Sequence, residues 1–203
     1  GINYLNPDKP NKFICDPRSS YLIYGGSCEM WIDFVEWLVL RGARKIIVSS
    51  ESKVQQPYPS RRLDLIRSLY GAKIHHVSGR IQTKENASEF ISEVYKIGPI
   101  NTVFILPVKT QHQLKQSDIK PVQYLDMALR NISPKTTFVN LFGAAFGVSQ
   151  NRVDVEFPTY NIEWPDTVDF TDVLFGLDEI LALRTRFVII KSAKVSDILQ
   201  ETT

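Results

Sequence analysis

The stretch that decides the fold is Ser19–Glu36, "SSYLIYGGSCEMWIDFVE". It opens with the short apolar run Tyr21–Tyr24, which has the length of a buried strand, and this run ends at the turn Gly25-Gly26. Polar and apolar residues over Ser27–Arg41 then recur with the period of a helix, for which the serine is the expected N-cap and Gly42 the expected end. A strand, a glycine turn and a helix in this order predict the first unit of an α/β sheet.

The same unit recurs along the rest of the chain. Apolar runs of strand length lie at 44–50, 73–79, 101–107, 137–142 and 186–192, and segments with a helical period separate most of them. The apolar stripes of these helical segments are Leu63, Ile66 and Leu69; Ala87, Phe90, Ile91 and Val94; Val122, Leu125, Ala128, Leu129 and Ile132; and Phe170, Val173, Leu174, Leu177, Ile180 and Leu181. Because the strands are apolar throughout, we expect a parallel, doubly wound sheet with helices on both faces.

Length and composition bound the class of protein. A chain of 203 residues with 43% hydrophobic and 23% charged residues is typical of one globular domain. Its net charge of +2 is too balanced to indicate nucleic acid or a membrane surface as a partner. The two cysteines, Cys15 and Cys28, do not make a disulfide framework, so we expect a reducing, cytoplasmic location.

The ends of the chain differ from its centre. Residues 1–18 are rich in Pro, Asn and Lys and start with glycine, which favours an incoming linker in a fragment of a longer protein. We expect one domain over 19–194 and an outgoing linker over 195–203.

Three segments resemble a known family. "FICDPRSSYLIYGG" (13–26), followed by "FVEWLVLRGARKIIVSS" (34–50), resembles the start of the catalytic ketoreductase subdomain of animal fatty acid synthases and type I polyketide synthases. "EVYKIGPINTVFILP" (93–107) is similar to its fourth strand and the helix before it, and 172–194 to its last helix and strand. The resemblance implies a Rossmann-like sheet of the short-chain dehydrogenase/reductase type.

Active members of that family use NADPH to reduce a β-ketoacyl group on an acyl carrier protein, and their first loop is rich in glycine. Here Gly25 and Gly26 match that loop, whereas the next glycine positions hold Cys28, Glu29 and Trp31. Side chains at these positions block the approach of a pyrophosphate to the helix. Glu29 either is an ordinary acid of the first turn, with Trp31 in the core, or replaces the charge of the lost phosphate.

By the resemblance, the other positions that contact the cofactor hold residues whose charge or hydrogen-bonding groups do not suit that contact. Glu51 stands where NADPH-using relatives place an arginine against the 2′-phosphate, and Arg80 stands where they place an acceptor for the adenine amino group. After the fourth strand, "LPVK" (106–109) replaces a run of small residues. We therefore expect the ancestral NADPH site to be lost and no cofactor to be bound.

The catalytic positions of the family also lack the required groups. Phe142-Gly143 replaces the serine pair, Glu156 lies near the position of the tyrosine, and Lys120 or Asp118 occupies that of the lysine. Tyr160 belongs to the sixth strand, so we interpret it as structural. Residues 143–158 show no helical period, which predicts that the catalytic fifth helix is missing or truncated.

Loss of that helix would leave part of an apolar sheet face bare near strands four to six. We expect the 143–158 loop, the arm at 1–17 or a neighbouring domain to cover it. Other functional signals are weak: His75 and His76 sit in a strand with His112 distant, so we expect no metal site, and Trp37 and Tyr95 are expected to serve packing.

Three functions remain open at this stage. The sequence favours a non-catalytic scaffold in a fatty-acid-synthase-like megasynthase, with neighbouring domains and the acyl carrier protein as partners. The alternatives are an NADPH-dependent β-ketoacyl reductase with an altered site, or a module that keeps a nucleotide or acyl ligand without turnover.

Overall fold

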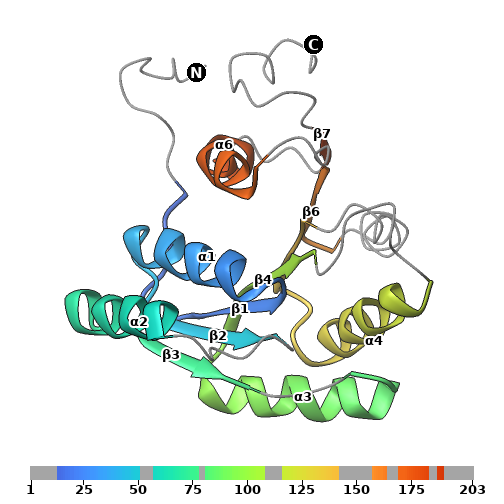
Figure 1. The fold of residues 1–203 in the computed structure, drawn as a ribbon. Coiled ribbons are helices and arrows are strands. Elements are labelled where there is room, and N and C mark those ends of the chain that lie inside the picture. The colour runs from blue at the N-terminus through green and yellow to red at the C-terminus, as the bar shows by residue number, and fades with distance from the viewer. Residues whose placement is uncertain are drawn as a thin grey trace, which may run out of the picture.

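The computed structural model describes residues 13–50, 57–77, 81–107, 116–141, 157–163, 169–182 and 187–189. Within these ranges strands and helices alternate along most of the chain (Figure 1). The elements are β1 (Ser20–Gly25), α1 (Cys28–Leu40), β2 (Lys45–Ser49), α2 (Pro57–Tyr70), β3 (Lys73–His76), α3 (Lys84–Ile97), β4 (Ile100–Leu106), α4 (Gln116–Ile132), β5 (Thr137–Asn140), β6 (Thr159–Glu163), α6 (Phe170–Ala182) and β7 (Phe187–Ile189).

The seven strands form one parallel sheet in the order β3-β2-β1-β4-β5-β6-β7. From β1 the chain builds outward to β3, then returns and builds β4 on the other side of β1. The order of strands therefore reverses between β1 and β4, which is where open α/β sheets of this kind hold their ligands. The expectation of a doubly wound parallel sheet is confirmed.

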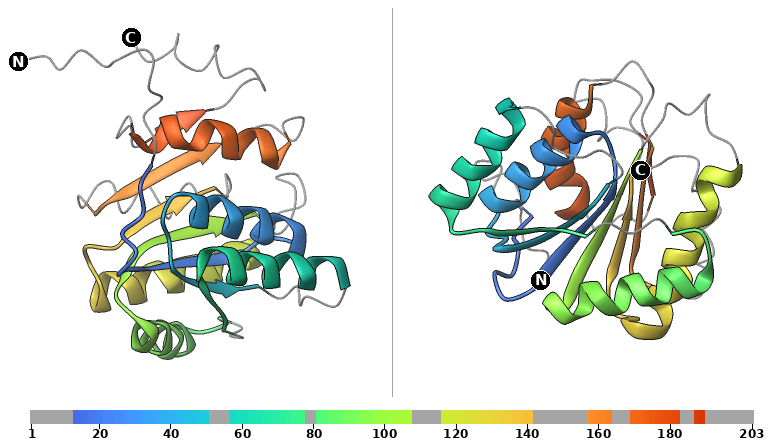
Figure 2. Two further views of the ribbon diagram at one scale, coloured as in Figure 1. Left: turned by 90° about the vertical axis from the view of Figure 1, so that its left-hand side faces the viewer. Right: turned by 60° about the horizontal axis from the view of Figure 1, so that its bottom comes forward.

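Helices cover both faces of the sheet (Figure 2). One core lies between the sheet and α1, α2 and α6, and the other between the sheet and α3 and α4. Successive strand residues alternate between the two: Tyr21 and Ile23 join the first core, and Leu22 joins the second. Each large apolar side chain that is fully buried in this way contributes about 1.5–3 kcal/mol.

Two of the predicted apolar stripes are buried completely. All four predicted residues of α3 and all six of α6 lie in the cores. The stripe of α2 is partly wrong, because Leu69 is 71% exposed while Leu63 and Ile66 are buried. This helix lies at the β3 end of the sheet and packs against α1, so only a narrow face is covered. Tyr95 is likewise exposed rather than packed.

The described part of the segment expected to be an incoming linker packs against the domain. The ring of Phe13 stacks on Trp37 of α1 with ring centroids 5.8 Å apart, and its N–H donates to Asp178 of α6. Cys15 is buried, and its N–H donates to the carbonyl oxygen of Arg41 at 2.8 Å. The start of the described chain thus joins α1 to α6.

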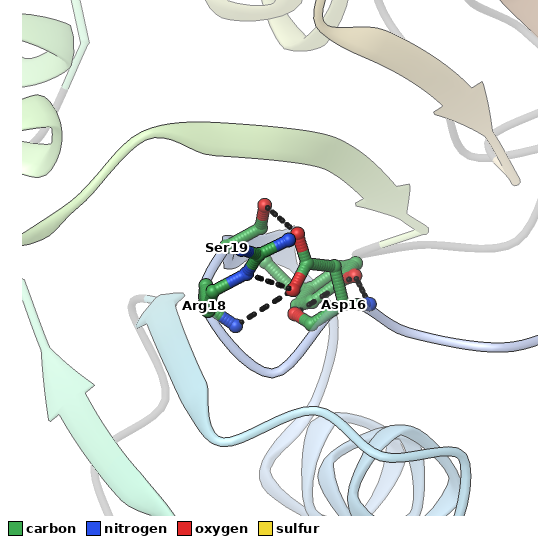
Figure 3. A network of polar contacts seen from close by, with 4 residues as sticks. Asp16, Arg18 and Ser19 are labelled. Atoms are coloured by element: carbon green, nitrogen blue, oxygen red, sulfur yellow. Dashed lines mark hydrogen bonds and ion pairs between the residues drawn. The ribbon is translucent and has the colours of Figure 1, made fainter.

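A turn held by Asp16 leads this segment into β1 (Figure 3). The carboxylate of Asp16 accepts hydrogen bonds from the N–H of Arg18 at 2.9 Å and from the hydroxyl of Ser19 at 3.4 Å. The backbone hydrogen bond from Arg18 is the main reason that the pKa of Asp16 is lowered. The N–H of Asp16 donates to the Tyr21 hydroxyl at 2.7 Å, which ties the turn to the strand.

We expect the free energy of unfolding to fall as the pH rises above about 9. Burial raises the pKa of the Cys15 thiol from 9.0 to about 11, so the folded protein holds this proton more tightly than the unfolded chain. The buried, protonated thiol contributes its full stabilisation of the fold below pH 9. Between pH 9 and pH 11 this contribution to the free energy of unfolding is lost at about 1.4 kcal/mol per pH unit. Burial also raises the pKa of Tyr21, which adds to the loss at higher pH.

Urea denaturation of the wild type and of Cys15→Ala at several pH values between 7 and 10 measures this dependence. The variant should show a flatter decline between pH 9 and 10, whatever its stability at pH 7. Equal slopes in the two proteins would contradict a thiol that titrates late because it is buried.

None of the helices in the described ranges is both long and apolar enough to cross a bilayer.

Candidate functional site: the crevice at the carboxyl ends of the strands

The candidate site lies where β1 and β4 end side by side. Gly25 is the last residue of β1 and pairs with Leu106, the last residue of β4. Gly26 follows directly and leads towards α1. The structure therefore places Gly25 and Gly26, the two residues assigned to cofactor binding by the sequence, at the topological switch point.

Both glycines are required by the packing of the protein itself. Their φ angles are +88° and +79°, values that residues with a Cβ rarely adopt. A Cβ on Gly25 would lie 2.6 Å from the carbonyl oxygen of Leu106, and one on Gly26 would lie 2.9 Å from Leu106 Cδ1. The side chain of Leu106 thus fills the space against Gly26. Close contact with β4 explains these glycines without any ligand, and their role in nucleotide binding stays a prediction.

The first turn of α1 already has an internal acceptor. Ser27 is extended at the N-cap, and its hydroxyl accepts the N–H of Met30 at 3.4 Å, which confirms the predicted cap. This N–H is one of the free donors that a phosphate at a helix N-terminus uses. Glu29 lies in the same turn with an exposed side chain, as an ordinary first-turn acid does. Its suggested role as a substitute for phosphate stays untested.

The indole of Trp31 is buried under α1 and lies near the carboxyl end of β3. Its side chain is 1% exposed and belongs to the core beneath α1. Its ring centroid lies 6.4 Å from that of His76, the last residue of β3. Since β2 separates β3 from β1 in the sheet, the indole extends from the first turns of α1 to the carboxyl end of β3. In the doubly wound fold, the adenosine half of a dinucleotide lies beside the end of the second strand.

A third contact closes the rim between β1 and β2. The hydroxyl of Ser50, just after β2, donates to the carbonyl oxygen of Gly26 at 2.8 Å. Within the described residues, groups of the protein therefore pack at three points of the crevice: Leu106 at the switch point, Ser50 on the loop and the indole of Trp31 towards β3.

The structure does not bring the remaining candidate catalytic groups together. Lys120 lies exposed on α4, and Asp118 is half-buried two residues earlier. Tyr160 is half-buried in β6 and packs against the core on the α1 and α6 side of the sheet. Because α4 covers the opposite face, the phenol and the lysine belong to different faces of the sheet.

Sequence reasoning missed a polar pair in the same region. Asn140 of β5 and Asn161 of β6 are register partners, and Asn140 Nδ2 donates to Asn161 Oδ1 at 3.2 Å. Both are almost fully buried, as is Thr159, and they alternate with residues of the α1 and α6 side, so they face the α4 side. This part of the sheet face is thus polar, whereas we expected it to be apolar, and its side chains are buried, as we expected of a covered face. The sequence did contain a signal for this pair, namely one asparagine in each of two predicted strands.

Several predicted positions lie outside the described residues. They are Glu51, Arg80, 108–109, His112, Phe142-Gly143 and Glu156, together with residues 143–156, where we expected the fifth helix to be missing. Within the part of the chain that the structure describes, no group of three or more His, Cys, Asp or Glu side chains is placed to hold a metal ion.

Known proteins share this fold at low sequence identity. An N-terminal ketoreductase from the macrolactin assembly line has 14% identity and a TM-score of 0.60, with 87% of this chain and 45% of that chain covered. A-type ketoreductases from a modular polyketide synthase have 14% identity and a TM-score of 0.62, with 91% and 49% covered. A short-chain dehydrogenase from Oenococcus oeni PSU-1 has 11% identity and a TM-score of 0.53, with 82% and 91% covered.

These likenesses establish the fold, and the chain spans less than half the length of the two ketoreductase chains. The family is established by a separate finding. A model of the KR domain, the ketoreductase family, matches residues 19–124, slightly more than half of the chain. The chain therefore belongs to the KR domain family.

Proposed function

We propose that this chain is a non-catalytic ketoreductase domain that serves as a scaffold in a fatty-acid-synthase-like megasynthase. The observation that carries the proposal is the packing of protein groups in the crevice, where Leu106 packs on Gly26 and the Trp31 ring lies beside His76. A bound NADPH needs this space, and protein groups that are already packed there must move before it can enter.

The chemistry of the reaction supports the same proposal. Reduction of a ketone needs a hydride donor, a phenol that protonates the developing alkoxide, and a cation that lowers the pKa of that phenol. Tyr160 and Lys120, the two described candidates, belong to opposite faces of the sheet. The positions that match the family's serine and tyrosine hold Phe142, Gly143 and Glu156 in the sequence.

The proposed partners are neighbouring domains of the same megasynthase, with the acyl carrier protein as a further candidate. Of the structures with this fold, one comes from the macrolactin assembly line and another from a modular polyketide synthase. In a multidomain enzyme a domain without turnover can still persist, because its surfaces position the domains that react.

One observation favours a second function, an NADPH-dependent β-ketoacyl reductase with an altered site. The chain belongs to a family of reductases and keeps Gly25 and Gly26 at the switch point. This alternative requires Leu106 and Trp31 to rearrange when the cofactor binds.

We expect the chain not to oxidise NADPH in the presence of a β-ketoacyl thioester. The measurement follows the absorbance of NADPH, with an active ketoreductase as the positive control. The rate with this chain should equal the rate in buffer, because the cofactor does not enter the crevice. A rate proportional to protein concentration and saturable in the thioester would establish the second function instead.

A further inference from the structure

We propose that Trp31 is the residue that excludes a nucleotide base from the crevice, and that its removal opens a site for a purine nucleoside. This inference rests on the proposed function. It adds which side chain closes the site, which half of the site it closes, and which class of ligand fits the space.

The position of the indole supports this role. Trp31 projects from the first turns of α1, and its ring lies beside His76 at the carboxyl end of β3. A nucleoside in a doubly wound sheet lies next to this region, beside the end of the strand that follows β1. An indole and a purine are both flat, fused bicyclic rings, so the indole fills a volume of purine size and shape.

The space would be open to solvent once the indole is removed. Trp31 itself is 1% exposed, whereas His76 next to it is an exposed residue at the end of the third strand. The indole therefore lies beside an exposed side chain at this end of the sheet. A smaller residue at position 31 would leave a recess bordered by His76, whose imidazole can stack on a base or pair with it.

No hydrogen bond to a described residue holds the Trp31 ring in place. Buried tryptophans usually find an acceptor for their N–H. Trp37, on the same helix, donates to the carbonyl oxygen of Leu174 at 3.0 Å. Among the residues that the structure describes, Trp31 Nε1 is buried and has no hydrogen-bond partner. The described surroundings thus accommodate a flat ring without an acceptor for its N–H.

The rest of the crevice stays closed when Trp31 is removed. Leu106 still packs on Gly26, and the Ser27 hydroxyl still accepts the N–H of Met30. The carboxylate of Glu29, in the first turn of α1, opposes a phosphate there. The recess is therefore expected to take an uncharged nucleoside and to reject a complete dinucleotide.

The experiment titrates Trp31→Ala, in the full chain, with adenosine and follows the heat of binding. We expect saturable binding with a dissociation constant on the order of 0.1–1 mM, typical of a small ligand of this size. The wild type should show no saturation over the same range. Trp37→Ala is the matched control, because it removes an equally large ring from the same helix on the side that faces α6. This control should not bind adenosine.

Indole serves as a second probe that separates a recess from a sealed cavity. If Trp31→Ala binds indole but not adenosine, the ring lies in a closed core and the proposal is overturned. If Trp31→Ala does not fold, Trp31→Leu keeps an apolar side chain in the core, and the same two probes decide in the same way. Binding of NADPH by the wild type would overturn the proposed function, whereas failure of adenosine to bind the variants overturns only this inference.

Discussion

Replacement of Gly25 with alanine should lower the free energy of unfolding by about 3 kcal/mol or more. The residue has a φ of +88°, which costs an alanine about 1–2 kcal/mol. In addition, the new Cβ would lie 2.6 Å from the carbonyl oxygen of Leu106, a backbone atom of the neighbouring strand that cannot rotate away. Forced shifts of this kind cost typically a further 1–3 kcal/mol.

Gly71→Ala is the control for this prediction. Gly71 also has a positive φ, +61°, but a Cβ there would meet no atom within 4 Å. It should therefore show only the conformational cost, about 1 kcal/mol. Urea denaturation of both variants measures the difference. Equal costs would contradict the close contact between Gly25 and β4, and with it the argument that packing explains this glycine.

The second large effect is expected at the ion pair between α1 and α6. The guanidinium of Arg41 binds the carboxylate of Asp178 through two nitrogens, with Nε 2.6 Å from Oδ1, and the two side chains are only 16% and 13% exposed. Arg41 also lies over the Trp37 ring, 3.9 Å from its centroid. Removal of either partner leaves a mostly buried charge unpaired, so Arg41→Ala and Asp178→Ala should each cost about 3 kcal/mol.

A double-mutant cycle tests whether the pair acts as a unit. The paired replacement Arg41→Met with Asp178→Leu leaves no buried charge and should cost less than either alanine variant. The double alanine variant should also cost clearly less than the sum of the two single variants. Additive costs would show that the two side chains stabilise the protein independently, and would contradict the role of this pair in holding α6 against α1.

Local sequence pattern is enough to predict most of the fold. The apolar residues of α3 and α6 recur with a helical period, and both stripes are buried as predicted. Ser27 is followed by an amphipathic run, and it caps α1 as predicted. Leu69 of α2 was predicted to be buried but is exposed. The width of the buried face of a helix depends on which elements cover it, and the periodicity of the sequence contains no information on those elements. The sheet end at α2 leaves that side of the helix in solvent.

The site is harder to predict, because its contacts join residues that are distant in sequence. Gly26 meets Leu106 only because β1 and β4 are neighbours, and Trp31 meets His76 only because β3 lies beyond β2. The pairing of Asn140 with Asn161 depends in the same way on the register of β5 against β6. The sequence identified Gly25, Gly26 and Trp31 as unusual, and the three-dimensional contacts add the residues that each of them packs against.

The most direct test of the account is a calorimetric titration of the wild-type chain with NADPH. We expect no saturable heat up to about millimolar NADPH, because Leu106 and Trp31 hold the space that the cofactor requires. Saturable binding with a micromolar dissociation constant would contradict the filled crevice and the proposal of a non-catalytic scaffold.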